Sequence, residues 1–510
     1  MRATGPRQEP RVRYEPVDPS FPSAFPSAFP AISFADVAAA VPRSSRRGDT
    51  EISDVALDSR TVGPGALFFC VPGAVTDGHD FAAAAVKAGA TALVVQRWLD
   101  LDVPQVLVPS VREAMGPMSA VAFGNPAGSM TVLGVTGTNG KTTTTYLMEA
   151  ILRAGGLRSG VVGTNGARVD GEPVPLARTT PEAPDLHRLL ARMRDAGVRG
   201  VAMEVSSHAL AQDRVGGVVF DAVAFTNLSR DHLDYHASME DYFDAKAALF
   251  TPEHAHVGAV NVDDPFGRRL AEAPEIPLSS FALDREADLR ADEVVATTEG
   301  LSFRIGERRL TSSLRGRFNV SNCLAAIALA RRIGIDDGVS AAGIEAVREV
   351  PGRVEPIDAG QGFLVVVDYA HTPDSIHTVL QAARPLTSGR LFIVFGCGGD
   401  RDRDKRPLMG RAATAGADLT VLTSDNPRSE DPMSIIEQIE VGAVAGGGDY
   451  VVEPDRRLAI RLALGRARPG DMVVIAGKGH EPYQVIGDTI EGFDDRQVAR
   501  EELLALRGRS

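Results

Sequence analysis

Cysteine is scarce in this chain, which has only three among its 510 residues: Cys70, Cys323 and Cys397. No two of them have the close, paired spacing of a structural zinc site, and so small a number argues against a disulfide framework. The composition therefore fits a protein of a reducing compartment.

Long apolar runs are also missing. No segment approaches the roughly 20 apolar residues that are needed to span a bilayer. Near the start, arginines such as Arg2 and Arg7 are followed by acidic residues and prolines, where a secretory signal would have an apolar core. We therefore expect a cytoplasmic protein without membrane insertion.

Positive charge is not in excess either, since the net charge is −13. The surface as a whole is thus unsuited to nucleic acid, although a local basic pocket for a nucleotide is compatible with it. What the chain does have is the composition of a globular protein, 44% hydrophobic and 24% charged. Its length predicts about three domains.

The order of patterns along the chain divides it into four segments. Residues 1–30 are polar and then proline-rich, and we expect a disordered tail without chemistry. Residues 31–128, 129–350 and 351–510 each alternate short apolar runs with helical stretches. This alternation predicts an α/β fold of three domains with parallel sheets: a small N-terminal domain, a central one and a Rossmann-like C-terminal one.

Individual strands can be predicted from runs of β-branched residues. The central segment has candidates at residues 131–135, 201–205 and 218–224. The C-terminal segment has candidates at residues 363–368, 390–395, 419–423 and 471–475.

A glycine-rich turn follows the first central strand, in Gly134-Val-Thr-Gly-Thr-Asn-Gly-Lys-Thr-Thr143. A strand, glycines and a helix that begins at a lysine form a loop whose N–H groups hold phosphates, so this is a P-loop candidate. The spacing is shorter than G-x-x-x-x-G-K-[ST], because Val135 breaks that pattern, and a simple turn with a solvated lysine is the alternative. The ATP-binding candidates here are Gly137, Thr138, Asn139, Gly140, Lys141, Thr142 and Thr143.

Three further residues are candidates for a metal site, but each also has a plainer interpretation. Glu204 ends a predicted strand, where a carboxylate can hold a hard cation such as Mg²⁺ or can simply face solvent. His232 lies between acidic residues, as in many solvated turns. Lys246 has the pattern of an exposed lysine on an amphipathic helix.

Several ordered segments together resemble the Mur ligase family over about residues 32–500. They are Gly137-Thr-Asn-Gly-Lys-Thr142, Glu204-Val-Ser-Ser-His208, Asn227-Leu-Ser-Arg-Asp-His-Leu-Asp234, Ala245-Lys246, Gly316-Arg-Phe-Asn319, Pro351-Gly-Arg353, Asp368-Tyr-Ala-His-Thr-Pro373 and Gly477-Lys-Gly-His-Glu481. The resemblance implies an ATP-dependent, ADP-forming acid–amino-acid ligase of peptidoglycan precursor synthesis, and so a part in cell-wall biogenesis, cell shape and cell division.

The resemblance also implies roles for individual residues, which the sequence pattern alone does not decide. The catalytic residues would be Lys141, His232, Lys246 and His371. Magnesium would be held by Thr142, Glu204, His232 and Lys246, the last as a carbamylated lysine. ATP would be held by the phosphate loop together with Asn261, Arg353 and Asp368.

The substrates implied by the resemblance are UDP-N-acetylmuramoyl-L-alanyl-D-glutamate and meso-diaminopimelate. The first would be held at its uridine end by Ser59 and Arg60 of a UDP-binding N-terminal domain. Its muramoyl-dipeptide end would be held by Thr179, Thr180, Ser206, Gln212 and Arg214. The amino acid would be held by Arg401, Asp425, Asn426, Pro427, Arg428, Gly477 and Glu481.

The acceptor motif Asp425-Asn-Pro-Arg428 decides between members of the family. A guanidinium suits a second carboxylate and would repel the side-chain ammonium of lysine. A lysine-adding ligase and a folylpolyglutamate synthetase-like ligase are the alternatives, and a P-loop GTPase or a non-catalytic nucleotide module fits the motifs less well. The sequence leaves the oligomeric state open, with a monomer expected.

Overall fold

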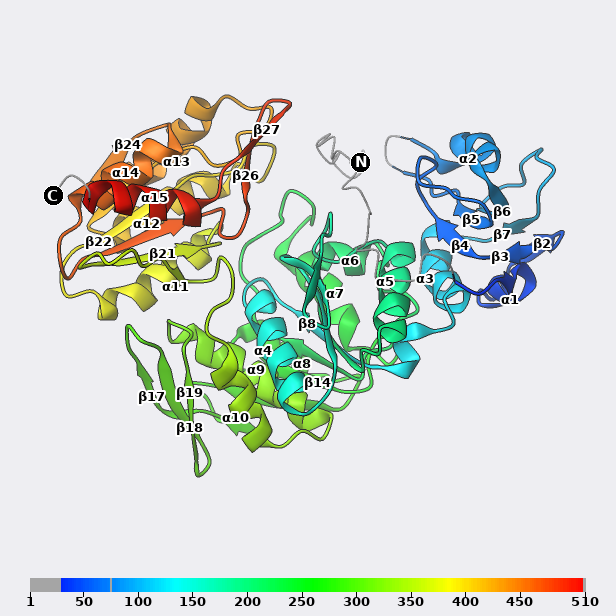
Figure 1. Ribbon diagram of the computed structural model, residues 1–510, viewed down its shortest axis with the longest axis horizontal. Helices are drawn as coiled ribbons and strands as arrows, with labels where there is room; N and C mark the ends of the chain where they lie inside the picture. The colour runs from blue at the N-terminus through cyan, green and yellow to red at the C-terminus, as the bar shows by residue number, and fades with distance from the viewer. Residues whose placement is uncertain (1–28, 74–75, 508–510) are drawn as a thin grey trace.

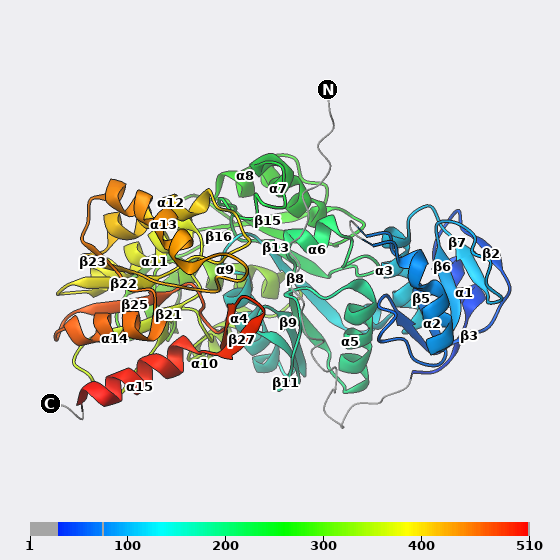
Figure 2. The ribbon, with the colours of Figure 1, turned by 90° about the horizontal axis from the view of Figure 1, so that it is seen from above.

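Three α/β lobes make up the protein in the computed structural model, which describes residues 29–73 and 76–507. Figure 1 shows the central lobe between the N-terminal and C-terminal ones, and Figure 2 shows the same order from above. The predicted α/β class with three domains is confirmed. No helix in the described ranges is long and apolar enough to cross a membrane.

The N-terminal domain is built on a five-stranded sheet in the order β2-β7-β6-β5-β4. All neighbours in it are parallel except β2 and β7. Its elements are α1 (Phe34–Ala39), β2 (Ser45–Arg47), β4 (Asp54–Ala56), β5 (Ala66–Phe69), α2 (Ala82–Ala88), β6 (Ala90–Val95), β7 (Gln105–Leu107) and α3 (Val111–Ala122), with β1 (Ile32–Ser33) and β3 (Glu51–Ile52) paired separately.

The tail expected at residues 1–30 lies outside the described residues, apart from its last two. Phe29 is buried, and its ring meets that of Phe123 edge to face with a centroid distance of 4.7 Å. The end of this segment therefore packs into the core of the N-terminal domain.

The central domain contains a nine-stranded sheet in the order β11-β10-β9-β12-β8-β13-β14-β15-β16. Its strands are β8 (Thr131–Thr136), β9 (Ser159–Gly163), β10 (Gly166–Val169), β11 (Glu172–Val174), β12 (Gly200–Glu204), β13 (Ala222–Phe225), β14 (Gly258–Asn261), β15 (Leu278–Ala282) and β16 (Leu289–Arg290). The strands of the expected parallel sheet are parallel except at one edge, where β10 and β11 run antiparallel to their neighbours. The β10–β11 turn has Asp170 and Gly171 at φ 51° and 95°, the positive-φ pair that suits a tight hairpin.

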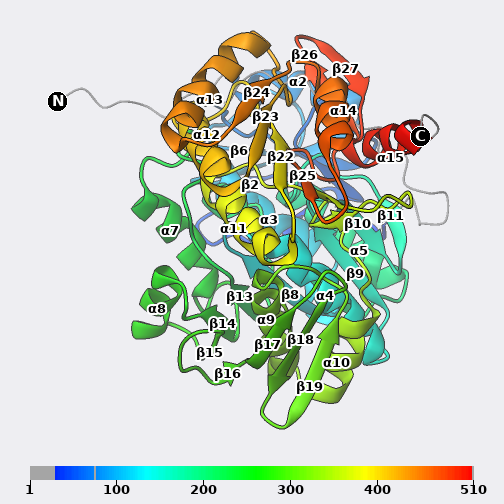
Figure 3. The same cartoon turned by 90° about the vertical axis from the view of Figure 1, so that its left-hand side faces the viewer.

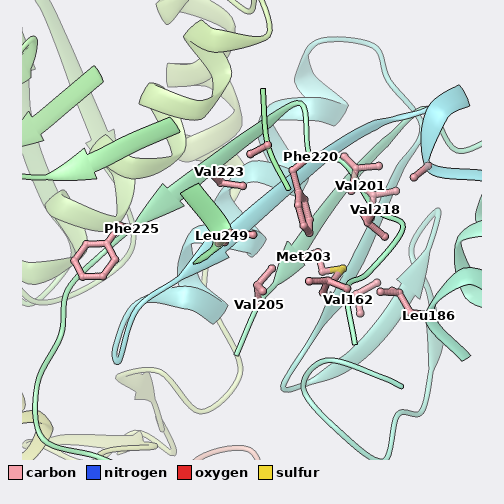
Figure 4. Packing of buried hydrophobic residues seen from close by; sticks show 14 of the residues in the cluster. Val162, Leu186, Val201, Met203, Val205, Val218, Phe220, Val223, Phe225 and Leu249 are labelled. Carbon is pink, nitrogen blue, oxygen red and sulfur yellow. The ribbon is translucent and has the colours of Figure 1, made fainter. Parts of the chain in front are cut away.

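Helices cover both faces of this sheet. One face packs against α4 (Lys141–Ala154) and α9 (Phe318–Arg332), and the other against α5 (Ala183–Asp195) and α7 (Met239–Ala247). Along β12, Val201 and Met203 join one core cluster and Ala202 the other, as the alternation of a buried strand requires. Figure 4 shows the first cluster, with Val201, Met203 and Phe220 among its side chains.

Other elements complete the central domain. They are α6 (Ser207–Ala211), α8 (Pro265–Glu272), α10 (Asp337–Ala346) and an antiparallel sheet of β17 (Asp292–Ala296), β18 (Leu301–Ile305) and β19 (Arg308–Ser312).

The C-terminal domain is a six-stranded sheet in the order β20-β21-β25-β22-β23-β24, parallel except for β20. The strands are β20 (Glu355–Pro356), β21 (Leu364–Asp368), β22 (Leu391–Phe395), β23 (Leu419–Leu422), β24 (Tyr450–Val452) and β25 (Met472–Ala476). One face is covered by α11 (Pro373–Ala383), α12 (Lys405–Gly416) and α13 (Pro432–Gly446), the other by α14 (Arg456–Arg466) and α15 (Asp495–Arg507). A hairpin of β26 (Tyr483–Ile486) and β27 (Thr489–Gly492) extends from this domain.

Candidate active site

The predicted phosphate loop connects β8 to α4 and has backbone angles that only glycine accepts readily. Gly137 has φ 141° and Gly140 has φ 89°. A Cβ at Gly137 would collide with the Thr226 hydroxyl, and one at Gly140 with the Asn322 side-chain oxygen. The loop is thus a tight cradle at the end of a buried strand and the start of a 14-residue helix, the arrangement that holds phosphate groups.

The segment after β13 holds this loop in place. The carbonyl of Asn227 accepts from Thr138 N at 2.8 Å, and its side-chain oxygen accepts from Asn139 N at 2.9 Å. The Thr226 hydroxyl donates to the Asn139 carbonyl at 2.6 Å. Neither Thr226 nor Asn227 had been assigned a role, although Asn227 begins one of the segments that carry the family resemblance. Both polar side chains directly follow an apolar strand, a signal that the sequence does contain.

Two lysines share one acceptor in the loop. Lys141 Nζ and Lys246 Nζ each donate to the carbonyl oxygen of Gly137 at 2.9 Å. Lys246 is only 1% exposed, so its interpretation as an exposed helix lysine is wrong. Burial lowers the pKa of both amines, and for Lys246 the nearby charge of Lys141 lowers it further.

Glu204, at the end of β12, is buried beside the loop. Its carboxylate accepts from the N–H of Thr164 at 2.8 Å and from the Thr164 hydroxyl at 3.0 Å. Within the described ranges, no three His, Cys, Asp or Glu side chains converge as a metal site. The oxygen donors expected for Mg²⁺ in this region are thus Glu204, the hydroxyl of Thr142 and a modified Lys246, and they are of the type that a hard cation takes.

His232 has a left-handed backbone, φ 55°, and its ring packs against that of His208 at a centroid distance of 4.7 Å. Its Nε2 lies 3.3 Å from the carboxylate of Asp231. Asp231 is buried and is also approached by His371 Nε2 at 3.6 Å and by Lys405 Nζ at 3.9 Å. Burial alone would raise the pKa of Asp231, but interactions with His232, His371 and Lys405 hold it well below its usual range. The sequence had not singled out Asp231.

Residues of the C-terminal domain reach the loop. Arg353 Nη2 donates to the Thr142 hydroxyl at 2.9 Å, and its guanidinium lies 4.7 Å from the centre of the Tyr369 ring. Asp368 accepts from the N–H groups of Val354 and Ala370 at 2.8 Å each. Figure 3, viewed from the C-terminal side, shows this domain above the central one.

Asn261, predicted to bind ATP, and His371, predicted to be catalytic, have mainly internal contacts. Asn261, at the end of β14, donates to the Thr226 carbonyl at 2.8 Å and accepts from Asp263 N at 3.0 Å. His371 is held by the Tyr369 carbonyl, which accepts from its Nδ1 at 2.7 Å. Asn261 therefore lies next to Thr226, part of the segment after β13 that supports the phosphate loop.

The residues predicted for the muramoyl-dipeptide form one cluster around the end of β12. Thr180 donates from its hydroxyl to the Glu204 carbonyl at 2.9 Å and accepts from Ser206 N at 3.2 Å. Arg214 donates to Gln212 at 2.7 Å and pairs with Glu182 at 3.0 Å. Thr179 joins the cluster through the Thr164 hydroxyl at 3.2 Å.

Ser59 and Arg60 lie apart from this cluster, on the loop between β4 and β5. The side-chain contacts of Arg60 go to Asp58, with Nε donating at 2.9 Å. In the part of the chain that the structure describes, these contacts stay within the N-terminal domain. A ligand held by both this loop and the dipeptide cluster would therefore have to extend from the N-terminal domain to the central one.

The predicted amino-acid residues converge at the carboxyl end of the C-terminal sheet. Asn426 donates to the Glu481 carboxylate at 2.9 Å, and Gly477 lies against the Asp425 carboxylate. Arg428 Nη1 donates to the Gly399 carbonyl at 2.7 Å. Pro427 precedes Arg428 in the same loop.

The side chains of Arg401 and Arg428 both approach Gly398. A Cβ built on Gly398 would be 2.8 Å from Arg428 Nη1 and 3.8 Å from Arg401 Cγ. The side chains of Arg401 and Arg428 thus lie close together at this end of the sheet, where Asn426 also holds the Glu481 carboxylate. This combination suits a zwitterion with an additional carboxylate.

Comparisons with known proteins agree with this geometry. Three family models match: "Mur ligase family, catalytic domain" at residues 51–121, "Mur ligase middle domain" at 135–330 and "Mur ligase, glutamate ligase domain" at 352–479. A relative from Geobacillus thermodenitrificans, named UDP-N-acetylmuramoyl-L-alanyl-D-glutamate--2,6-diaminopimelate ligase, is 46% identical over 89% of this chain and 95% of its own.

Two solved structures have the same fold. One, a UDP-N-acetylmuramoyl-L-alanyl-D-glutamate--2,6-diaminopimelate ligase, has a TM-score of 0.65 and 33% identity, and the match covers 90% of this chain and 96% of that one. The other, a MurF ligase from Thermotoga maritima in complex with ADP, has a TM-score of 0.61 and 18% identity over 90% of this chain and 98% of that one, and shows the fold alone. The family models and the 46% identical relative together show that the chain belongs to the Mur ligase family.

Proposed function

We propose that this chain is the ATP- and Mg²⁺-dependent ligase that joins meso-diaminopimelate to the D-glutamate carboxylate of UDP-N-acetylmuramoyl-L-alanyl-D-glutamate. The observation that carries the proposal is that Arg401 and Arg428 meet at Gly398, beside the loop in which Asn426 binds Glu481, in the domain that also supplies Arg353 to the phosphate loop. The names of the 46% identical relative and of the 33% identical structure support the same substrate pair.

The chemistry follows from the groups in the site. A carboxylate is a poor electrophile, so the γ-phosphoryl group of ATP first converts it to an acyl phosphate. Lys141 and Arg353 stabilise the negative charge on the group in transfer. The amine of the amino acid then attacks the acyl carbon, and phosphate leaves with the C–O electron pair. The Arg353–Thr142 contact joins the two domains at the loop. Closure of this junction would protect the acyl phosphate from water.

Magnesium would be held by Thr142, Glu204, His232 and a carbamylated Lys246. The bound ion would neutralise charge on the phosphate oxygens. Asn261 and Asp368 would complete the nucleotide site, and His371 would lie near the γ-phosphate.

The surroundings of Lys246 favour carbamylation. Two buried ammonium groups on one carbonyl oxygen repel each other, and burial already favours the neutral amine of Lys246. A neutral amine adds to CO₂ and releases a proton, which gives a carbamate with one negative charge. The product would replace a like-charge pair by a Lys141–carbamate ion pair.

The three domains divide the substrates between them. Residues 31–128 would hold the uridine end through Ser59 and Arg60, and residues 129–350 would hold ATP and the muramoyl-dipeptide. Residues 351–510 would hold the amino acid. A single chain supplies all of these groups, so we propose a monomer. The three buried, unpaired cysteines suit the cytoplasm, where peptidoglycan precursors with a UDP group are made.

The test is phosphate release with ATP, Mg²⁺ and UDP-N-acetylmuramoyl-L-Ala-D-Glu, with meso-diaminopimelate compared against L-lysine. We expect release with diaminopimelate alone. Release with lysine instead would keep the ligase and overturn the acceptor assignment. Release with neither would favour a folate-type ligase of the same fold.

A further inference from the structure

The core of the C-terminal domain contains an ion pair that none of the roles above uses. Arg456 and Asp495 both have fully buried side chains, and Arg456 donates from Nε and Nη2 to the two carboxylate oxygens at 2.7 and 2.6 Å. Arg456 is the first residue of α14 and Asp495 the first of α15. The pair therefore joins the starts of the two helices on one face of the sheet.

Two further donors of this guanidinium go to backbone carbonyls just before the two loops of the amino-acid site. Nη1 donates to the Ser424 carbonyl at 3.2 Å, and Nη2 donates to the Ala476 carbonyl at 2.9 Å. Ser424 directly precedes Asp425, and Ala476 directly precedes Gly477. One side chain thus fixes the origins of both segments that carry the proposed amino-acid ligands.

These two loops follow strands that are not neighbours. The first comes after β23 and the second after β25, and β22 lies between those strands in the sheet. Backbone hydrogen bonding between adjacent strands therefore does not set the distance between the loops directly. The planar guanidinium spans this gap, since its donors diverge at fixed angles.

Stability alone is a weak explanation for such a pair. Two charges lose their hydration on burial, and well-packed apolar residues often stabilise a core as well or better. A role in fixing the distance between the two loops explains why the guanidinium of Arg456 is buried here. The Asn426–Glu481 hydrogen bond of 2.9 Å depends on the same spacing, because it joins the two loops further along.

We propose that Arg456, held by Asp495, is a positioning residue that sets the spacing of the two amino-acid-binding loops and thereby the affinity for the acceptor. It is not one of the residues assigned to the amino acid or the nucleotide. This inference rests on the proposed function, because it assigns the amino acid to residues 425–428 and 477–481.

The chain supplies a matched control in the next residue. Arg457 also joins α14 to α15, through Glu501 at 2.8 Å and Glu502 at 3.1 Å, but on the surface and without contact to either loop. Arg457→Lys therefore disturbs the same pair of helices and leaves the loop origins intact.

The experiment measures phosphate release by the full-length enzyme for wild type, Arg456→Lys and Arg457→Lys. Diaminopimelate is varied at saturating ATP, and then ATP at saturating diaminopimelate. For Arg456→Lys we expect the KM for diaminopimelate to rise at least about tenfold, because small displacements of binding groups have large effects. The KM for ATP should stay within about twofold, since the nucleotide contacts are elsewhere. Arg457→Lys should match wild type in both.

A second variant covers the case in which Arg456→Lys does not fold. The double substitution Arg456→Met with Asp495→Leu replaces both charged side chains by apolar ones, which favours a folded core. It should show the same selective rise in KM. A folded variant with wild-type KM for diaminopimelate, or an equal rise in both KM values, would overturn the inference. A wild-type enzyme that releases no phosphate with diaminopimelate would instead overturn the proposed function.

Discussion

Arg353 and Thr142 are joined by a hydrogen bond of 2.9 Å that crosses from the C-terminal domain to the first turn of α4. The same guanidinium lies over the ring of Tyr369, which keeps it extended toward the central domain. The phosphate loop is therefore completed by a residue from another domain. Catalysis should depend on this contact more than folding does.

Replacement of Arg353 by alanine should lower kcat by about 10²–10³, because one preorganised cationic donor to the transferring phosphoryl group is lost. The melting temperature should change little. Phosphate release and a thermal melt are the two measurements. Arg384→Ala, which removes an exposed pair with Asp418 in the same domain, is the control and should keep full activity. A variant of Arg353 with normal kcat would show that this residue is only an interdomain contact.

Lys246→Ala should be nearly inactive and should recover in part when a short-chain carboxylate such as formate is added. The reason is that the small acid can occupy the space of the lost carbamate and supply its charge. The exposed Lys87 provides the control, since Lys87→Ala should be active and insensitive to the acid. Full activity of Lys246→Ala without any addition would rule out a role for the carbamate.

Arg428→Ala should raise the apparent KM for diaminopimelate more than about tenfold, because truncation of one partner of a charge-assisted contact costs about 2–5 kcal/mol. The KM for ATP should be unaffected. Steady-state phosphate release gives both constants, and Arg468→Ala, an exposed arginine of the same domain, is the comparison. Unchanged amino-acid kinetics would contradict the assignment of Arg428.

His187 should make stability depend on pH. Its ring is fully buried, Nε2 donates to the Gly216 carbonyl at 2.9 Å, and burial lowers its pKa from 6.5 to about 4. The unfolded chain therefore binds a proton on this residue at a higher pH than the folded chain does. The stabilisation is complete above pH 6.5 and is lost as the pH falls toward 4.

The measurement is urea unfolding at pH 7 and pH 4.5 for wild type and His187→Gln, which keeps a donor for Gly216. Between these values wild type should lose about 2 kcal/mol more than the variant. Other groups titrate in both proteins, so the difference isolates the imidazole. Equal losses would show that His187 is not the titrating group.

Much of the fold could be predicted from short-range patterns. The strand candidate at residues 131–135 corresponds to β8 and the one at 419–423 to β23, because buried parallel strands are continuous apolar runs. The hairpin of β10 and β11 was missed, although Asp170-Gly171 carries its signal. Boundaries were displaced where loops begin, as at residues 218–224, where β13 starts only at Ala222.

The candidate site could be predicted less completely than the fold, for a physical reason. The burial of Lys246 depends on Gly137, which is 109 positions away, and no local periodicity contains that information. Asp231 gains its importance from His371 and Lys405 of another domain. Arg456 and Asp495 look like ordinary charged residues at helix starts, and only the packing of two helices on one sheet turns them into a buried pair.

The backbone of Arg428 has a consequence for protein engineering. The residue has φ 52°, its N–H donates to the Val485 carbonyl at 3.0 Å, and its own carbonyl accepts from Gly487 N at 2.7 Å. The β26–β27 hairpin thus holds this arginine in a left-handed conformation that a non-glycine residue rarely adopts unaided. If residues 425–428 alone were introduced into a related ligase, nothing would hold the Arg428 backbone in this conformation, and its guanidinium would not be oriented. To transfer the acceptor preference, the β26–β27 hairpin would have to be introduced together with these residues.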